Sequence, residues 1–257
     1  VEPLMGDRRD EIADLGQDFD RMAQQIQSLI GAQRRLLHDV SHELRSTLAR
    51  LQAAVGLARQ DPAKMEATLD RIEREVVRLD GLVGQLLALA RLDAGSRDFR
   101  EETLDLVDLA AAIADDAGFE AEAQGRTLVF EGHGEAEALV RGELIQRAFE
   151  NVIRNAVKYT ADGTQVAVTA TVTDGRFLLR VADHGPGVPE ADLEAIFEPF
   201  YRGRNGQDKA GFGLGLAIAR RAVEAHGGRI LARNGAEGGL EVEITLPLGA
   251  SAQARKE

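Results

Sequence analysis

Two histidines near the start of the sequence, His38 and His42, are the first residues whose type and spacing could do chemistry. They lie in a predicted helix, where offsets of three and four residues bring side chains to one face. His38, His42 and Arg45 therefore share an exposed face, away from the apolar stripe. An imidazole nitrogen is a nucleophile, and the carboxylate of Glu43 could orient the ring or accept its proton. Taken alone, an exposed helical histidine is more often an ordinary surface residue.

Amide and ammonium groups form a second cluster on another predicted helix. Asn151 and Asn155 are four residues apart and share a face, and Lys158 follows one turn later. The amide oxygen of Asn155 can bind Mg²⁺, while Lys158 can meet a phosphate. Without further context, such an asparagine pair would be assigned to the surface.

Two glycine-containing strings follow. The first, Asp183 to Gly187, comes directly after a predicted strand. Its carboxylate could accept a hydrogen bond from an adenine amino group, and its glycines would let the backbone approach the base, although such residues also make ordinary turns. The second string, Gly211 to Leu216, opens a helix whose backbone N–H groups could hold phosphates. It matches neither the dinucleotide fingerprint nor the Gly-Lys-Ser/Thr phosphate loop.

A helical hairpin is predicted to carry the histidines. Apolar residues alternate in steps of three and four from Ile12 to Leu29 and from Leu36 to Val55, which predicts one long helix, with or without a hinge near Gly31. Asp61-Pro62 predicts the start of a second helix, whose seam runs from Met65 to Ala90 before Asp93-Ala94-Gly95 ends it. Pairing with a second copy, as a four-helix bundle in a homodimer, would bury both stripes.

The rest of the chain is predicted to be an α+β two-layer sandwich. Two strand pairs and three helical stretches alternate there, and Asp174-Gly175 supplies a hairpin turn. The strands are expected at 165–172, 177–182, 228–233 and 240–246, and the helices near 107–123, 143–158 and 214–225. The expected divisions are a signalling helix (1–31), a dimerisation and histidine domain (32–97), a linker (98–103), the sandwich (104–249) and a tail (250–257).

Composition excludes several classes of function. The net charge is −12 and no run is rich in Lys or Arg, so the sequence offers no basic surface for binding nucleic acid. The absence of cysteine excludes disulfides, thiol nucleophiles and Cys-based zinc sites and fits a cytoplasmic location. No segment reaches the roughly 20 apolar residues that cross a bilayer. The chain is thus expected to be soluble, and its start at Val1 suggests a piece of a longer, membrane-bound protein.

The string from Leu37 to Arg45 resembles the H-box of bacterial sensor histidine kinases. The resemblance implies that His42 is the phosphoacceptor, that Glu43 is its acidic neighbour, and that Ser46 helps to dephosphorylate the partner regulator. Thr47 stands where family members usually carry a proline. Because proline kinks a helix, Thr47 is expected to straighten it.

The later strings resemble the family's ATP-binding module, in the family's order. Asn151 to Tyr159 is similar to its N-box, and Ile196 to Arg202 to its F-box, with a lid expected at 203–210. The resemblance implies a Bergerat-type fold that binds Mg²⁺-ATP, with Asn155 as the metal ligand and Arg202 either on phosphate or on the surface. The implied nucleotide residues are Asn151, Asn155, Lys158, Tyr159, Asp183, Gly185, Gly187, Arg202, Gly211, Gly213, Leu214, Gly215 and Leu216.

The resemblance implies autophosphorylation of His42 by ATP, then transfer to an aspartate in the receiver domain of a response regulator, with phosphatase activity towards that regulator. The segment from Asp10 to Ile30 also resembles a HAMP signal relay, which implies a parent protein in the bacterial inner membrane. Two alternatives stay open. One is a phosphatase-biased or non-catalytic scaffold, which Thr47 favours; the other is a clamp-type ATPase, which would lack the H-box.

Overall fold

The computed structural model describes residues 11–60, 65–93, 100–203, 211–236 and 238–248. Within these ranges, no helix is both long enough and apolar enough to span a membrane. The chain divides into two compact units, with the division after Leu79.

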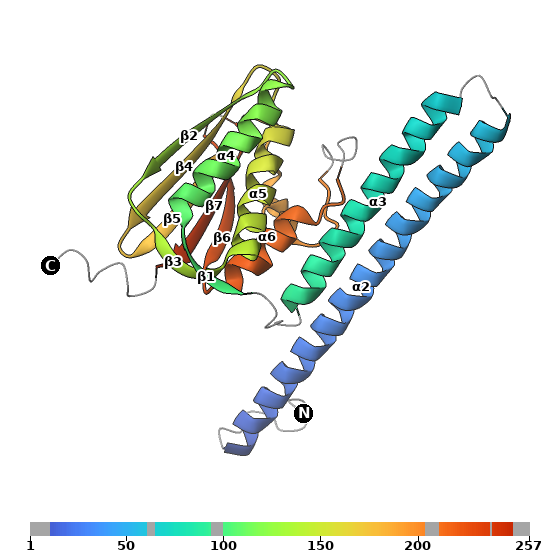
Figure 1. The fold of residues 1–257 in the computed structure, drawn as a ribbon. Coiled ribbons are helices and arrows are strands. Elements are labelled where there is room, and N and C mark those ends of the chain that lie inside the picture. The colour runs from blue at the N-terminus through green and yellow to red at the C-terminus, as the bar shows by residue number, and fades with distance from the viewer. Residues whose placement is uncertain (1–10, 61–64, 94–99, 204–210, 237, 249–257) are drawn as a thin grey trace. The chain divides into compact units, whose positions relative to one another are not determined.

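The first unit is built on two long helices, α2 (Glu11–Gln60) and α3 (Met65–Asp93). Helix α3 continues past the division after Leu79. The two helices run side by side in opposite directions, and Arg50 of α2 meets Glu75 of α3 (Figure 1). Helix α2 is continuous through Gly31 and Thr47, so neither residue interrupts it. The turn signal at Asp61-Pro62 lies outside the described residues.

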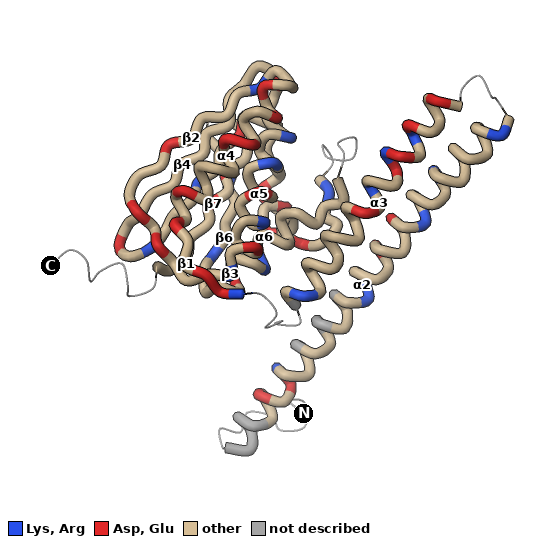
Figure 2. Tube along the Cα trace, viewed as in Figure 1, with Lys and Arg blue, Asp and Glu red and all other residues tan. Residues whose placement is uncertain are grey.

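The hairpin buries several side chains but leaves many large apolar ones exposed. Thr47 and Ala54 of α2 are fully buried, and Thr68 of α3 is nearly so. Of the heptad residues expected in the seam, Leu44, Leu51 and Ile72 are partly buried, whereas Leu48 and Leu69 are 51% and 55% exposed in the single chain. Acidic and basic residues are interspersed along both helices (Figure 2). The single chain therefore presents an apolar stripe that another surface must cover; it includes Phe19, Met22, Ile26, Leu48, Val55, Met65, Leu69 and Val76.

The second unit contains a five-stranded sheet with the order β2-β4-β5-β7-β6. Strands β2 and β4 are parallel, and the other neighbours are antiparallel. The bounds are β2 Thr127–His133, β4 Gln165–Thr173, β5 Arg176–Ala182, β6 Arg229–Asn234 and β7 Leu240–Pro247. The strand pairs predicted around 165–182 and 228–246 are confirmed.

A small sheet corrects the predicted linker at 98–103. Strand β1 (Glu101–Asp105) pairs with β3 (Glu137–Arg141), so residues 101–103 belong to the second unit. Cross-strand hydrogen bonds to a segment more than thirty residues away hold them, and no local pattern could reveal that partner. The other expected divisions stay predictions.

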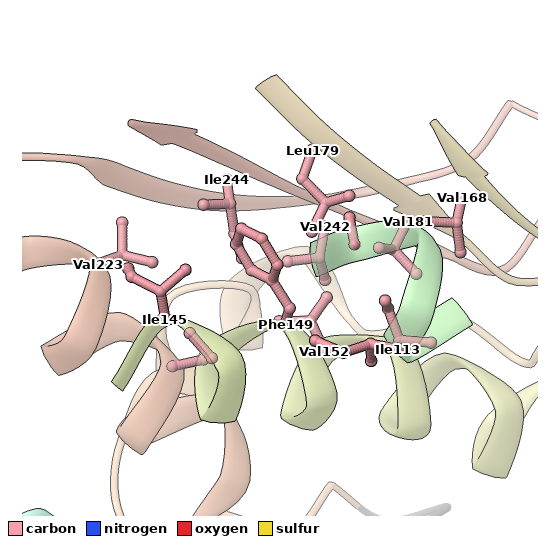
Figure 3. Packing of buried hydrophobic residues seen from close by; sticks show 14 of the residues in the cluster. Ile113, Ile145, Phe149, Val152, Val168, Leu179, Val181, Val223, Val242 and Ile244 are labelled. Atoms are coloured by element: carbon pink, nitrogen blue, oxygen red, sulfur yellow. The ribbon is translucent and has the colours of Figure 1, made fainter. Parts of the chain in front are cut away.

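Three helices cover one face of the large sheet: α4 (Leu106–Glu122), α5 (Gly142–Tyr159) and α6 (Gly215–Glu224) (Figure 1). The core lies between these layers. Figure 3 shows Phe149 of α5 pointing towards the sheet residues Val242 and Ile244, with Val223 of α6 beside it. Phe149 also stacks on Phe177 with the ring centroids 5.6 Å apart. The predicted two-layer sandwich is confirmed.

His226, just after α6, is expected to make a pH-dependent contribution to the stability of this unit. Its Nε2 accepts the backbone N–H of Arg141 at 3.0 Å, so the ring proton is on Nδ1, 2.7 Å from the carbonyl oxygen of Ala222. Burial, the largest cause, lowers the pKa of His226 below its ordinary 6.5. Protonation of the folded ring would abolish the acceptor at Nε2.

The unfolded state therefore binds the proton first, and the stability that His226 contributes is complete above pH about 6.5. As the pH falls through that value, the free energy of unfolding should decline by at most about 1.4 kcal/mol per pH unit. Urea unfolding between pH 5 and 8, compared with His226→Gln, measures this. An identical pH dependence in the variant would contradict it.

Candidate functional site

Helix α5 places the predicted amide and ammonium groups on one side. Burial follows the helical period, and Phe149, Val152 and Ile153 are fully buried. The remaining face carries Asn151, Asn155, Lys158 and Tyr159, which are partly exposed, and is therefore available to a ligand.

Asp183 lies just beyond the end of β5 and is only 6% exposed. Its Oδ1 accepts the backbone N–H of Gly185 at 2.7 Å and that of Leu240 at 3.1 Å. Its own N–H donates to the carbonyl oxygen of Leu240 at 3.0 Å. These hydrogen bonds fix a carboxylate in a nearly water-free position, where any further hydrogen bond to it is strengthened.

Glycine is required beside this carboxylate. A Cβ at Gly185 would lie 2.5 Å from the carbonyl oxygen of Tyr159 and 2.9 Å from Oδ1 of Asp183. Gly187 has φ +66°, and a Cβ there would lie 2.8 Å from Oδ1 of Asn234. A side chain at Gly185 would therefore push the loop away from α5, and one at Gly187 would push it away from Asn234 at the end of β6.

The start of α6 meets the polar face of α5. A Cβ at Gly215 would lie 2.9 Å from Oδ1 of Asn151, and one at Gly211 would lie 2.9 Å from Nζ of Lys158. The amide and the ammonium thus lie against the backbone of the glycine string. The N-cap residue Leu214 makes no side-chain hydrogen bond to the helix. Backbone N–H groups at this end are suited to an anion.

The glycine string is held in place by the predicted F-box. Gly213 has φ +72°, and a Cβ there would lie 2.5 Å from the carbonyl oxygen of Tyr201. The N–H of Phe200 donates to the carbonyl oxygen of Gly213 at 2.9 Å. Leu214 is fully buried and Leu216 packs against the core. Only the backbone of these two leucines is therefore suited to contact a nucleotide. The predicted lid at 203–210 lies almost entirely outside the described residues.

Cationic side chains gather at the same place. Burial lowers the pKa of Lys158, and the positive charge of Arg202 lowers it further. The Lys158 ammonium also lies 4.7 Å from the centroid of the Tyr159 ring. Burial raises the pKa of the Tyr159 hydroxyl, while Arg202 opposes that shift. Because the two cations repel each other, an anion bound between them would be favoured.

Three residues that support this site were missed in the sequence. The Thr160 hydroxyl accepts a hydrogen bond from the backbone N–H of His184 at 3.1 Å. The Asn234 Oδ1 accepts one from the backbone N–H of Val188 at 2.9 Å. The backbone N–H of Leu240 donates to Oδ1 of Asp183. Thr160 follows the N-box directly, which was an available signal. Asn234 and Leu240 carried none, because only strand pairing brings them to Asp183.

In the first unit, the structure places His42 on the exposed face of α2, with Glu43 partly exposed next to it. The rings of His42 and His38 are in contact, with centroids 4.4 Å apart and an interplanar angle of 63°. The predicted shared face is thereby confirmed for the two histidines.

Ser46 and Thr47 are held by Arg50. Its Nη1 donates to the Ser46 hydroxyl at 2.8 Å, and its Nη2 donates to the Thr47 hydroxyl at 3.0 Å. Its Nε lies 3.0 Å from each carboxylate oxygen of Glu75 on α3. The residue in the usual proline position therefore joins a hydrogen-bond network between the helices.

Thr47→Pro is expected to lower the free energy of unfolding by about 3 kcal/mol, because proline inside a helix loses a backbone donor and clashes with the preceding turn. Thr47→Val keeps the β-branched shape and loses only the bond from Arg50, so its expected cost is about 1 kcal/mol. Urea unfolding followed by circular dichroism compares the two. Equal stability of both variants would show that the backbone of α2 tolerates proline here.

Comparison with known proteins identifies both units. A family model described as the His Kinase A (phospho-acceptor) domain matches residues 32–95. A second model, the histidine kinase-, DNA gyrase B- and HSP90-like ATPase, matches residues 141–250. The matches contain His42 and the predicted nucleotide strings respectively.

Relatives support the same assignment over most of the chain. Sensor histidine kinase CpxA of Escherichia coli is 36% identical over 236 residues, covering 91% of this chain and 51% of CpxA. Sensor protein PfeS of Pseudomonas aeruginosa is 35% identical, covering 95% of this chain and 53% of PfeS. The chain thus spans about half of the length of these relatives.

Among solved structures, full-length ShkA in complex with AMPPNP is 28% identical, with a TM-score of 0.62 over 81% of this chain and 44% of ShkA. In this chain the two family models follow each other in the order of the helical unit and the sandwich. The chain therefore belongs to the family of bacterial two-component sensor histidine kinases.

Proposed function

We propose that this chain binds Mg²⁺-ATP in its second unit and transfers the γ-phosphoryl group to His42. The observation that carries the proposal is that the polar face of α5 contacts the glycine string. Asn151 lies against Gly215, and Lys158 lies against Gly211. The carboxylate of Asp183 is buried in the same unit. The site thereby combines a carboxylate that can bind the adenine base with cationic side chains that can bind the phosphates. The relative crystallised with AMPPNP, an ATP analogue, supports this reading.

Each residue has a proposed task in nucleotide binding. Asp183 would accept the adenine amino group, because its carboxylate is buried and held by backbone donors. Lys158 and Arg202 would neutralise phosphate oxygens, together with the N–H groups at the start of α6. Asn155 fits a Mg²⁺ ligand, since its amide lies on the same exposed face of α5. Mg²⁺ would neutralise charge on the phosphates, which supply most of its other ligands together with water.

The proposed step forms one bond and breaks one. A His42 ring nitrogen attacks the γ-phosphorus, the bond to the bridging oxygen breaks, and its electron pair leaves with ADP. Glu43 is adjacent and partly exposed, so it can hold the ring or take its other proton. Most of the rate enhancement would come from positioning the reactants, which the exposed setting of His42 permits.

We also propose that the chain acts as a homodimer and passes the phosphoryl group to an aspartate of a response regulator. The exposed apolar stripe, with Leu48 and Leu69 about half exposed, supports pairing with a second copy. Ser46, held by Arg50 one turn after His42, is the proposed helper in dephosphorylating the regulator. The HAMP-like string from Asp10 to Ile30 supports a parent protein of the bacterial inner membrane.

Incubation with γ-labelled ATP and Mg²⁺ tests the proposal. The chain should acquire a label that acid removes and base preserves, as expected of a phosphorus–nitrogen bond, and excess EDTA should prevent labelling. A clamp-type ATPase would hydrolyse ATP without retaining label, and a non-catalytic scaffold would do neither. Either of those results would overturn the proposal.

A further inference from the structure

The ring of His38 touches that of His42, but phosphoryl transfer leaves His38 without a task. Both side chains are exposed on α2, four residues apart. Their ring centroids are 4.4 Å apart, and the ring planes are inclined at 63°. Two imidazoles on one helical face, at this spacing, form the simplest bidentate site for a metal ion.

The observed separation fits such a chelate. With metal–nitrogen bonds of about 2.0–2.1 Å and a nitrogen–metal–nitrogen angle of about 90–109°, two bound imidazoles have centroids about 4.5–5.3 Å apart. The observed 4.4 Å is just below this range, so a small change in the side-chain torsions would bring the rings to the chelating distance. A ring centroid lies nearly on the Cβ–Cγ axis. Rotation about that bond can therefore turn the nitrogens towards a common ion while the centroids hardly move.

The donor set indicates the class of ion. Imidazole nitrogen suits Zn²⁺, Ni²⁺ and Cu²⁺, whereas Mg²⁺ and Ca²⁺ prefer oxygen. The chain contains no cysteine to compete for a soft ion. In the described part of the chain, no group of three or more potential ligands gathers. Water would therefore complete the coordination, which makes the site weak and readily exchangeable.

We propose that His38 and His42 together bind a Zn²⁺, Ni²⁺ or Cu²⁺ ion, and that the bound ion inhibits phosphorylation of His42. The bound His42 nitrogen has its lone pair in the metal bond, and the other ring nitrogen carries the proton. Neither can then attack phosphorus. The binding half of this inference is independent of the proposed function, whereas the inhibition half rests on it.

Direct titration tests the binding half. The full chain is titrated with Ni²⁺ or Zn²⁺ in a calorimeter, without nucleotide, alongside His38→Gln and the matched variant His133→Gln. His133 is an exposed histidine at the end of β2, remote in sequence from the pair. Loss of one of two chelating imidazoles should weaken binding at least about tenfold in His38→Gln, while His133→Gln should bind as the wild type does. Equal affinity in all three proteins would overturn the site.

Phosphorylation at fixed Mg²⁺-ATP and buffered free Zn²⁺ tests the inhibition half. The ratio of the rates without and with Zn²⁺ should be several-fold larger for the wild type and His133→Gln than for His38→Gln. Equal ratios would overturn the inhibition even if binding is present. If the wild type is not labelled in Mg²⁺-ATP without Zn²⁺, the proposed function fails instead. The titration then still decides whether the metal site at His38 and His42 exists.

Discussion

His42→Gln is expected to abolish the labelling of the chain by γ-labelled ATP, while ATP still binds with unchanged affinity. Glutamine keeps a polar side chain on the exposed face of α2, but its amide nitrogen has no lone pair free to attack phosphorus. Because His42 is exposed, the substitution leaves no cavity and no unpaired buried group, so the helix should remain intact. The measurement is the retained label per chain, together with nucleotide affinity by calorimetry.

His133→Gln is the control for His42→Gln, since it removes an exposed histidine from another part of the chain. That variant should be labelled as the wild type is. Label that persists in His42→Gln would disprove the assignment of the acceptor, and tryptic mapping would then show which residue carries the phosphoryl group.

Asp183→Asn is expected to raise the Kd for ATP about 10- to 100-fold, the equivalent of about 1.5–3 kcal/mol for a hydrogen bond to a charged group. The amide oxygen of asparagine can still accept the N–H groups of Gly185 and Leu240, which Oδ1 accepts in the wild type. Its amide nitrogen, however, cannot accept the adenine amino group. The fold should therefore survive while base recognition is lost.

The ratio of ATP to GTP affinity sharpens this experiment. The amide nitrogen of asparagine can donate to the oxygen of guanine, so Asp183→Asn should narrow the preference for ATP. Asp162→Asn is the matched control, because Asp162 is 87% exposed and pairs with Arg126; its affinities should equal those of the wild type. A folded Asp183→Asn protein with unchanged ATP affinity would mean that adenine binds elsewhere.

The labelling experiment on His42 and the affinity experiment on Asp183 test separate units of the molecule. Labelling depends on His42 in the helical unit, and base recognition depends on Asp183 in the sandwich. A variant that loses ATP binding must also lose label, whereas His42→Gln should lose label alone. This asymmetry distinguishes a defective acceptor from a defective nucleotide site.

Most of the local structure followed from the sequence because its determinants are local. The three-four spacing of apolar residues predicted α2 and α3, and Asp174-Gly175 predicted the turn between β4 and β5. The linker was predicted too long, since β1 is specified by its partner β3 rather than by its own residues. Similarly, Thr47 was recognised as unusual, but its bond to Arg50 required the antiparallel packing of α3.

By itself, the sequence determined the chemistry that is available: an exposed histidine, two amides, a lysine, a carboxylate and two glycine strings in a fixed order. Only the tertiary structure decided how they meet. It placed Asn151 against Gly215 and Lys158 against Gly211, tied Asp183 to Leu240, and brought Arg50 to Glu75. The physical reason is that residue type and spacing set propensities within one element. Contacts between elements depend on packing across a sheet or between helices, where the partner is distant in sequence.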